Sequence, residues 1–231
     1  MSDNPHKMHR IRQKARFRKH GLEVFDPHQV LEMLLFFGIP QGDINPLAHE
    51  LIKTFGSLNR VLDADYRELI KVKGIGEHAA TLITLMSPLF RYYSMNADIS
   101  ELTFNTPDHV GDYLVGCYAG YTEEVISLVS LDGMCRVLSI DIIGKGDVGS
   151  ATISQRHLIE TVIRTNANAV ILCHNHPGGI ALPSAEDLAA TMRIAKSLKE
   201  LHISLVDHFI LAGNDYISLY QSENYKHIFK V

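Results

Sequence analysis

The chain has 231 residues, 46% of them hydrophobic, and a formal net charge of −4, so it is long enough for one large or two modest globular domains. Its longest apolar run, residues 33–37, is far too short to cross a bilayer, and residues 1–7 lack the apolar core of a signal peptide. These features exclude a membrane-spanning protein and lead us to expect a cytoplasmic one, in agreement with three widely spaced cysteines outside any Cys-x-x-Cys pair.

The basic residues are concentrated near the N-terminus. Residues 1–95 contain 13 Lys and Arg against 10 Asp and Glu, whereas residues 96–231 contain 9 against 16. Much of the basic excess lies in residues 9–20, which could meet phosphates. A solvated helix face or a basic N-terminal arm explains the same run equally well.

Residues 1–95 are predicted to form a small, all-helical domain. Apolar residues recur at helical spacing from Asp26-Pro27 to residue 38, and again from Asn45-Pro46 to Phe55, where Gly56 ends the pattern. Another helix is predicted after residue 76, with its apolar side formed by Ala79, Ala80, Leu82, Ile83 and Leu85.

A glycine-containing turn precedes that last helix. Residues 69–82 contain an apolar residue, a Gly-Ile-Gly turn and a following helix with Ala and Leu, an order that resembles a helix-hairpin-helix motif. Two glycines allow a tight turn and leave bare amides at a helix N-terminus, which can bind a DNA phosphate without reading bases. An ordinary helical hairpin would contain the same glycines for steric reasons. The carboxylate of Glu77, directly after the turn, would also repel a phosphate. The expected DNA backbone contacts are Lys71, Lys73, Gly74 and Gly76.

A second domain is predicted at residues 106–231, after a linker at residues 96–105 that lacks periodicity. A turn at Asp132-Gly133 should pair two strands as a hairpin, and glycines 144, 146 and 149 mark a loop. Strands that alternate with helices predict a mixed sheet with helices packed on it, an α+β fold. The expected elements are helices at 106–118, 154–166 (core residues Leu158, Ile159, Val162 and Ile163) and 184–200, and strands starting at 124, 135, 169, 203 and 216.

The most informative stretch runs from His174 to Asp187. His174 and His176 are two residues apart, so at the end of a buried strand both imidazoles lie on one face. Pro177, Gly178, Gly179 and Pro183 force an irregular loop, after which Ser184 starts a helix with Asp187 in its first turn. Two imidazoles and one carboxylate make three protein ligands, the number that a catalytic zinc site uses while a fourth position stays open for water.

Other interpretations fit parts of this stretch. A single His-x-His is common on protein surfaces, and Ser184 with Asp187 also fits a purely structural capping box. A contiguous His-Asn-His matches an HNH nuclease in letters only, because the residues of that motif are spread along the chain. The conjunction of all these residues favours the metal site.

The spacing His-x-His-Pro, seven residues, then Ser-x-x-Asp, resembles the JAMM (JAB/MPN) metalloprotease motif at every fixed position. The Asn between the histidines, the Pro-Gly-Gly after them and a later Asp207-His208-Phe209-Ile210 resemble the bacterial RadC branch of that superfamily, over about residues 104–222. One departure is Gln155-Arg156-His157, where the family commonly has Pro-Arg-Glu.

The resemblance implies a zinc metallopeptidase or isopeptidase in which His174, His176 and Asp187 hold Zn²⁺. Glu124, at the start of a strand, would take the proton of a zinc-activated water and pass it to the leaving amine, without ligating the metal. Ser184 would donate a hydrogen bond to the oxyanion.

Several further expectations come with the resemblance. Asp207 and His208 could support the ligands from behind, Asp207 by fixing the tautomer of a ligand histidine. The JAMM resemblance implies a peptide or isopeptide substrate as one partner. RadC also carries an association with DNA repair, which implies DNA, bound without sequence specificity, as a second partner. Two alternatives remain open: a zinc-dependent nuclease, and a non-catalytic adaptor associated with DNA.

Overall fold

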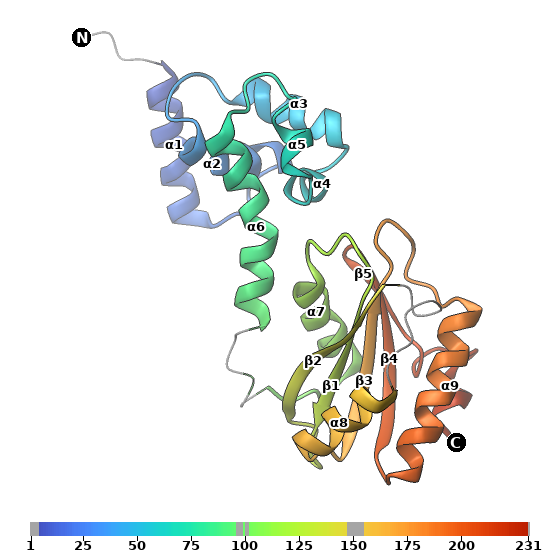
Figure 1. Ribbon diagram of the computed structural model, residues 1–231. Coiled ribbons are helices and arrows are strands. Elements are labelled where there is room, and N and C mark those ends of the chain that lie inside the picture. Colours follow the sequence, from blue (N-terminus) through green and yellow to red (C-terminus); the bar gives the residue numbers. More distant parts are fainter. Residues whose placement is uncertain (1–4, 96–98, 100–101, 147–154, 231) are drawn as a thin grey trace. The chain divides into compact units, whose positions relative to one another are not determined.

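The computed structural model describes residues 5–95, 99, 102–146 and 155–230 (Figure 1). The chain divides into two compact units, Met1–Leu89 and Phe90–Val231, and the division falls within one helix, α6 (Glu77–Met95). None of the helices in the described ranges is long and apolar enough to cross a membrane.

The first unit consists of helices in its described residues. Asp26 caps α2 with Pro27 in its first turn, and Gly56 ends α3 in the left-handed conformation with φ of 94°, as the sequence pattern predicts. The core of the unit is built around α2, whose Leu31 and Leu35 are completely buried. Its helices are α1 (Pro5–His20), α2 (Pro27–Gly38), α3 (Asn45–Phe55), α4 (Leu58–Leu62), α5 (Tyr66–Leu69) and the first part of α6.

Helix α1 contains the basic segment at residues 9–20 and contacts α2 through hydrogen bonds of its polar side chains. The His9 Nε2 lies 2.9 Å from Oε1 of the buried Glu32, and the Arg10 guanidinium donates to the carbonyl of Ile39 at 2.8 Å. Arg16 donates to the side chain of Gln29 at 3.3 Å. These three residues of the basic segment therefore stabilise the fold of the unit itself.

The second unit is an α+β fold around a five-stranded sheet in its described residues. The strand order is β2-β1-β3-β4-β5; the β3–β4 pair is parallel and the other three pairs are antiparallel. This mixed sheet with helices confirms the predicted fold class. Its elements are α7 (Pro107–Tyr118), β1 (Val125–Leu131), β2 (Val137–Lys145), α8 (Gln155–Thr165), β3 (Ala169–Asn175), α9 (Ala185–Glu200), β4 (Ser204–Ala212), β5 (Asp215–Ser218) and the 3-10 helix η2 (Lys226–Lys230).

The two faces of the sheet carry separate hydrophobic clusters. Val170 and Leu172 of β3 pack with residues of α8 and α9, whereas Ile171 and Cys173 pack with residues of α7 (Figure 1). Successive side chains of a strand point to opposite faces, so His174 shares the face of Leu172, toward α9. This alternation places the first predicted metal ligand on the side of the sheet that also carries Asp187.

Two local predictions are wrong. Ile163 is 66% exposed, because α8 turns Leu158 and Val162 toward the sheet and residue 163 lies about 100° further round the helix. Gly144 belongs to β2, where it pairs with Ile126 beside a register shift, and an added Cβ would lie 3.3 Å from the Ile126 side chain.

The segment around residues 96–105 is described only in part. Thr103 forms an isolated β-bridge with Arg136, and Phe104 is buried in the α7-side cluster. The predicted start of α8 at Ser154 and the loop glycine Gly149 lie outside the described residues.

Candidate metal centre

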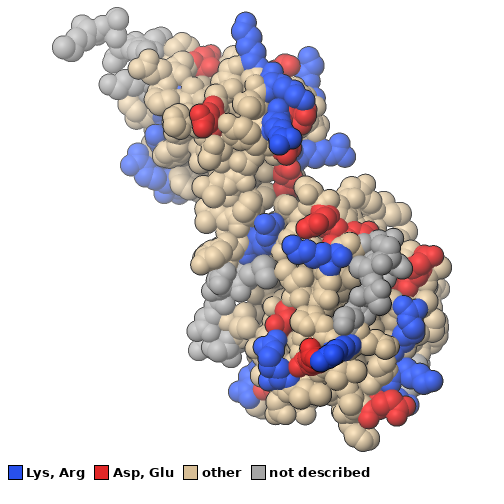
Figure 2. Space-filling view, in the orientation of Figure 1, with Lys and Arg blue, Asp and Glu red and all other residues tan. Residues whose placement is uncertain are grey.

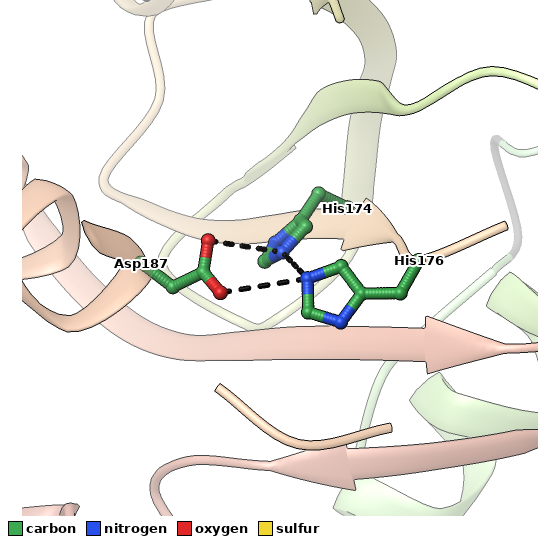
Figure 3. Close-up of side chains that lie close together, drawn as sticks. All are labelled: His174, His176 and Asp187. Carbon is green, nitrogen blue, oxygen red and sulfur yellow. Dashed lines mark hydrogen bonds and ion pairs between the residues drawn. The ribbon is translucent and has the colours of Figure 1, made fainter. Parts of the chain in front are cut away.

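The three predicted ligands come together at the ends of two elements. His174 lies near the end of β3, His176 follows that strand, and Asp187 lies in the first turn of α9 (Figure 3). The two Nε2 atoms are 2.9 Å apart, and Asp187 places Oδ1 3.2 Å from His174 Nε2 and Oδ2 3.4 Å from His176 Nε2. One potential ligand atom from each residue therefore lies within 4.8 Å of the others.

A reciprocal capping box orients Asp187. Ser184 is the N-cap of α9, and its hydroxyl accepts from the Asp187 amide at 3.1 Å while donating to Asp187 Oδ2 at 2.7 Å. The Ser184 amide donates to the same Oδ2 at 2.8 Å. Because Oδ2 accepts both bonds, Oδ1 is the oxygen left for a ligand.

The Asp187 carboxyl is ionised at neutral pH. Burial by itself raises its pKa, but the hydrogen bond and charge of His174 in its protonated form, together with the bonds from Ser184, outweigh that effect, and the pKa lies well below its ordinary value. An ionised carboxylate is the form that binds a metal.

A buried chain of hydrogen bonds assigns the tautomer of His174. Thr191 donates its hydroxyl proton to the carbonyl of Asp187 at 2.6 Å, so at its 2.7 Å contact with His208 Nδ1 it must accept. His208 is neutral, since burial and the neighbouring His174 lower its pKa well below the ordinary value, and its Nε2 therefore accepts. The His174 Nδ1, 2.8 Å away, must donate, so in the neutral imidazole that binds a metal the Nε2 carries no proton.

His176 reaches the same state by a separate contact. Its Nδ1 lies 3.1 Å from the carbonyl oxygen of Ile180, which can only accept, so the proton is on Nδ1. With both imidazoles neutral, two Nε2 lone pairs face each other at 2.9 Å beside an anionic oxygen. This donor set fits a divalent cation, because a positive ion between the three atoms would turn mutual repulsion into coordination.

Comparison with known proteins agrees with this geometry. A family model of the RadC-like JAB domain matches residues 104–225. The chain belongs to the RadC-like JAB family. Among its relatives are UPF0758 proteins of Carboxydothermus hydrogenoformans (34% identical over 210 residues, 90% of this chain and 92% of the relative), Clostridium perfringens (29% over 214 residues, 93% of each) and Pseudomonas fluorescens (30% over 208 residues, 90% and 93%).

The predicted general base of this RadC-family chain, Glu124, directly precedes β1, which pairs with β3. β1 and β3 are antiparallel and their register ends at the pair Ile126 and His174; if it continued by two residues, Glu124 would lie opposite His176. Residues directly opposite each other share a face of the sheet. Glu124 is half-buried, and its carbonyl accepts from Gly146 at 2.8 Å, which continues the β1–β2 ladder past the start of β1.

Asn175, between the two histidines, holds the backbone on both sides of Glu124. Its side-chain oxygen accepts from the Val125 amide at 2.7 Å, and its side-chain nitrogen donates to the Glu123 carbonyl at 3.1 Å. The sequence contains this asparagine within the family motif, but its partners lie about fifty residues away, so spacing alone does not predict the contact.

Asp207 and His208 are both predicted to support the ligands, with Asp207 fixing the tautomer of a ligand histidine. Their contacts differ from this prediction. His208, rather than Asp207, contacts a ligand histidine. Asp207 accepts from the His208 amide at 2.7 Å, the Tyr220 amide at 3.0 Å and the Ser218 hydroxyl at 2.5 Å, and so fixes the backbone that carries His208. Burial raises the pKa of Asp207 to about 6, although these hydrogen bonds lower it in part.

The predicted DNA-contact residues lie on the turn between α5 and α6, outside the residues that the RadC-like model matches. Gly74 has φ of 101°, and Gly76 precedes the first residue of α6. Lys71 is paired with Glu68 at 2.5 Å, whereas Lys73 is exposed.

Acidic residues lie among these basic ones. The turn borders a cleft of about 1130 Å³ that is lined by Lys71 and Lys73 but also by Asp43, Glu50 and Glu68. On the face seen in Figure 2, blue and red side chains intermingle over α3 and α5. The turn therefore has mixed charge rather than a continuous basic surface.

Proposed function

We propose that this RadC-family protein is a zinc-dependent hydrolase of the JAMM type that cleaves peptide or isopeptide bonds. The observation that carries the proposal is the pair of Nε2 atoms of His174 and His176, 2.9 Å apart, beside Oδ1 of Asp187. The other polar atoms of these side chains are committed to Ser184, Ile180 and His208. Three protein donors of this kind are typical of catalytic zinc sites.

Each remaining side chain of the centre has a separate task. Bound zinc would supply a nucleophile at neutral pH by acidifying water. Glu124 would accept the proton and return it to the leaving amine, with Asn175 fixing its backbone position. Ser184 would donate to the oxyanion, which requires its hydroxyl to rotate away from Asp187 Oδ2 while its amide keeps that oxygen in place.

Two wider expectations form part of the same proposal. A cytoplasmic location is supported by three free thiols, Cys117, Cys135 and Cys173. DNA backbone contact at the α5–α6 turn, and with it a link to DNA repair, is supported by the glycine turn and by the exposed Lys73, and it is opposed by Glu77.

The test combines metal content with the substitution Glu124→Gln. Elemental analysis of protein purified without added metal should find about one zinc per chain in the parent and in Glu124→Gln, because Glu124 is not a ligand. Hydrolysis of a peptide library and of lysine-linked isopeptides should be lost in Glu124→Gln only. The neighbouring Glu123→Gln is the matched control, since that exposed carboxylate pairs with Lys145 instead.

The outcomes separate this proposal from its alternatives. Cleavage of plasmid DNA that depends on Glu124, without amide cleavage, would assign a nuclease. If the parent protein neither contains zinc nor takes it up on reconstitution, both the peptidase and the nuclease hypotheses are overturned, and the non-catalytic adaptor is favoured.

A further inference from the structure

The N-terminal unit contains an apolar cleft with a basic mouth. The cleft has a volume of about 580 Å³ and is formed by α1, the segment after it, α2, α4 and α6. Ten of its twelve lining side chains are apolar, and the other two are Lys14 and Arg18 of α1. Its size and apolar lining are those of a ligand-binding pocket.

The rim of the cleft is unusually apolar for a surface. Its floor includes the completely buried Leu31, but Phe17, Leu22 and Phe37 at its sides are 39%, 44% and 65% exposed. Exposed large apolar side chains are ordinary when scattered singly, whereas three around one cleft form a contiguous patch, and such patches are typical of binding sites.

In the described residues of the unit, no ion pair compensates the charge of Lys14 and Arg18. The Lys14 ammonium lies 4.5 Å from the centre of the Phe37 ring, and Arg18 Nε donates to the Lys14 carbonyl at 3.3 Å. Within the described ranges neither side chain forms an ion pair, and no acidic residue lines the cleft. His9, Arg10 and Arg16 on the same helix, by contrast, bond to α2 and its neighbours.

We propose that this cleft docks an acidic, amphipathic segment of a partner protein. A bulky apolar side chain of the partner would enter between Phe17 and Phe37, and flanking carboxylates would pair with Lys14 and Arg18. Charge complementarity favours this occupant because, in the described part of the chain, neither Lys14 nor Arg18 already pairs with a carboxylate. DNA is disfavoured, since phosphates gain nothing from apolar walls. The inference concerns the N-terminal unit and stands apart from the proposed hydrolase.

The test uses the full chain and a defined probe. A fluorescein-labelled peptide of three Asp-Leu-Glu-Phe repeats should bind saturably by fluorescence anisotropy, and versions with Lys for the acids or Ser for the apolar residues should not. The double variant Lys14→Glu/Arg18→Glu should weaken binding about tenfold, as should Phe37→Ala, because attraction becomes repulsion in the first and an aromatic rim contact is lost in the second.

Matched controls keep the result interpretable. Arg12→Glu/Lys19→Glu changes the net charge of the same helix by the same amount, and Leu85→Ala truncates an exposed side chain of α6. None of these three residues lines the cleft, so both control variants should bind the peptide like the parent. The proposal is overturned if the peptide does not bind, or if the control variants weaken it as much. Dimerisation, or binding of a DNA duplex or of phosphatidylglycerol vesicles, that is lost in Phe37→Ala would assign the cleft to another occupant and equally overturn it.

Discussion

The candidate metal centre and the α5–α6 turn were both predicted from short motifs, but their surroundings differ. At the centre, His174 and His176 each donate Nδ1–H to a neighbour, and the Ser184 amide donates to Oδ2 of Asp187. At the turn, Lys71 is paired with Glu68, and other acidic side chains line the adjoining cleft.

The contrast shows what tertiary contacts add to a motif. Side chains are oriented to bind a cation when neighbouring groups form hydrogen bonds with all their polar atoms except those that would coordinate the ion. A phosphate site has an equivalent requirement, a uniform positive field, which the acidic residues near the turn reduce. The metal centre therefore has stronger support than the DNA contact, and the following experiments can reverse or sharpen that ranking.

The largest effect is expected for His176→Ala. Loss of one of three protein ligands should reduce zinc from about one ion per chain to less than about a tenth, measured by elemental analysis. His176 is 19% exposed, so circular dichroism should show an intact fold. His227→Ala, in the exposed part of η2, is the control, and equal zinc in both variants would contradict the assigned centre.

Removing the buried carboxyl of Asp207 should change how stability depends on pH. Its pKa is about 6 in the folded protein and about 4 unfolded, so between these values the native state binds more protons and stability falls as pH rises. Asp207→Asn lacks this penalty, and its free energy of unfolding relative to the parent should increase by up to about 3 kcal/mol from pH 4 to pH 7.

Urea unfolding at several pH values measures this difference. Asp215→Asn, on an exposed residue of β5, should show no comparable trend. A parallel pH dependence of the parent and Asp207→Asn would refute the raised pKa.

Thr191→Val should weaken zinc binding from a distance. Without the hydroxyl, His208 Nδ1 has no acceptor, and the alternative tautomer would donate from His208 Nε2 to His174 Nδ1 and shift the His174 proton onto its ligand nitrogen. We expect a 10- to 100-fold loss of affinity, about 1.4–2.7 kcal/mol, in competition with a chelator. Thr191→Ser keeps the hydroxyl and should rescue binding, so equal affinities for Val and Ser would exclude the relay.

The smallest effect is expected at the turn. Lys73→Gln should reduce affinity for a DNA duplex only a few-fold and lower the salt dependence by about one phosphate contact, as measured by anisotropy at several salt concentrations. Lys53→Gln, an exposed residue of α3 outside the acid-lined cleft, is the control. Equal behaviour of the two variants would remove the turn from the DNA contact.

Local patterns predicted the fold class and most elements of both units. The helix starts at Asp26-Pro27 and Asn45-Pro46, the Asp132 hairpin and the β3 strand all depend on neighbours within a few residues. Ile163 was assigned to the core wrongly, because which side of α8 faces the sheet is set by the position of the helix in space and not by its composition.

The sequence by itself determined the candidate ligand set, since His174 and His176 are one strand repeat apart and Ser184 and Asp187 one helical turn apart. Only the tertiary structure decided which nitrogen His174 offers, because His208 lies 34 residues from it. It also decided that Asn175 holds the residues on either side of Glu124, across a separation of 50 residues. The physical reason is that side-chain spacing within one element is set by backbone geometry, whereas a proton's position depends on whichever partner folding brings within hydrogen-bonding distance.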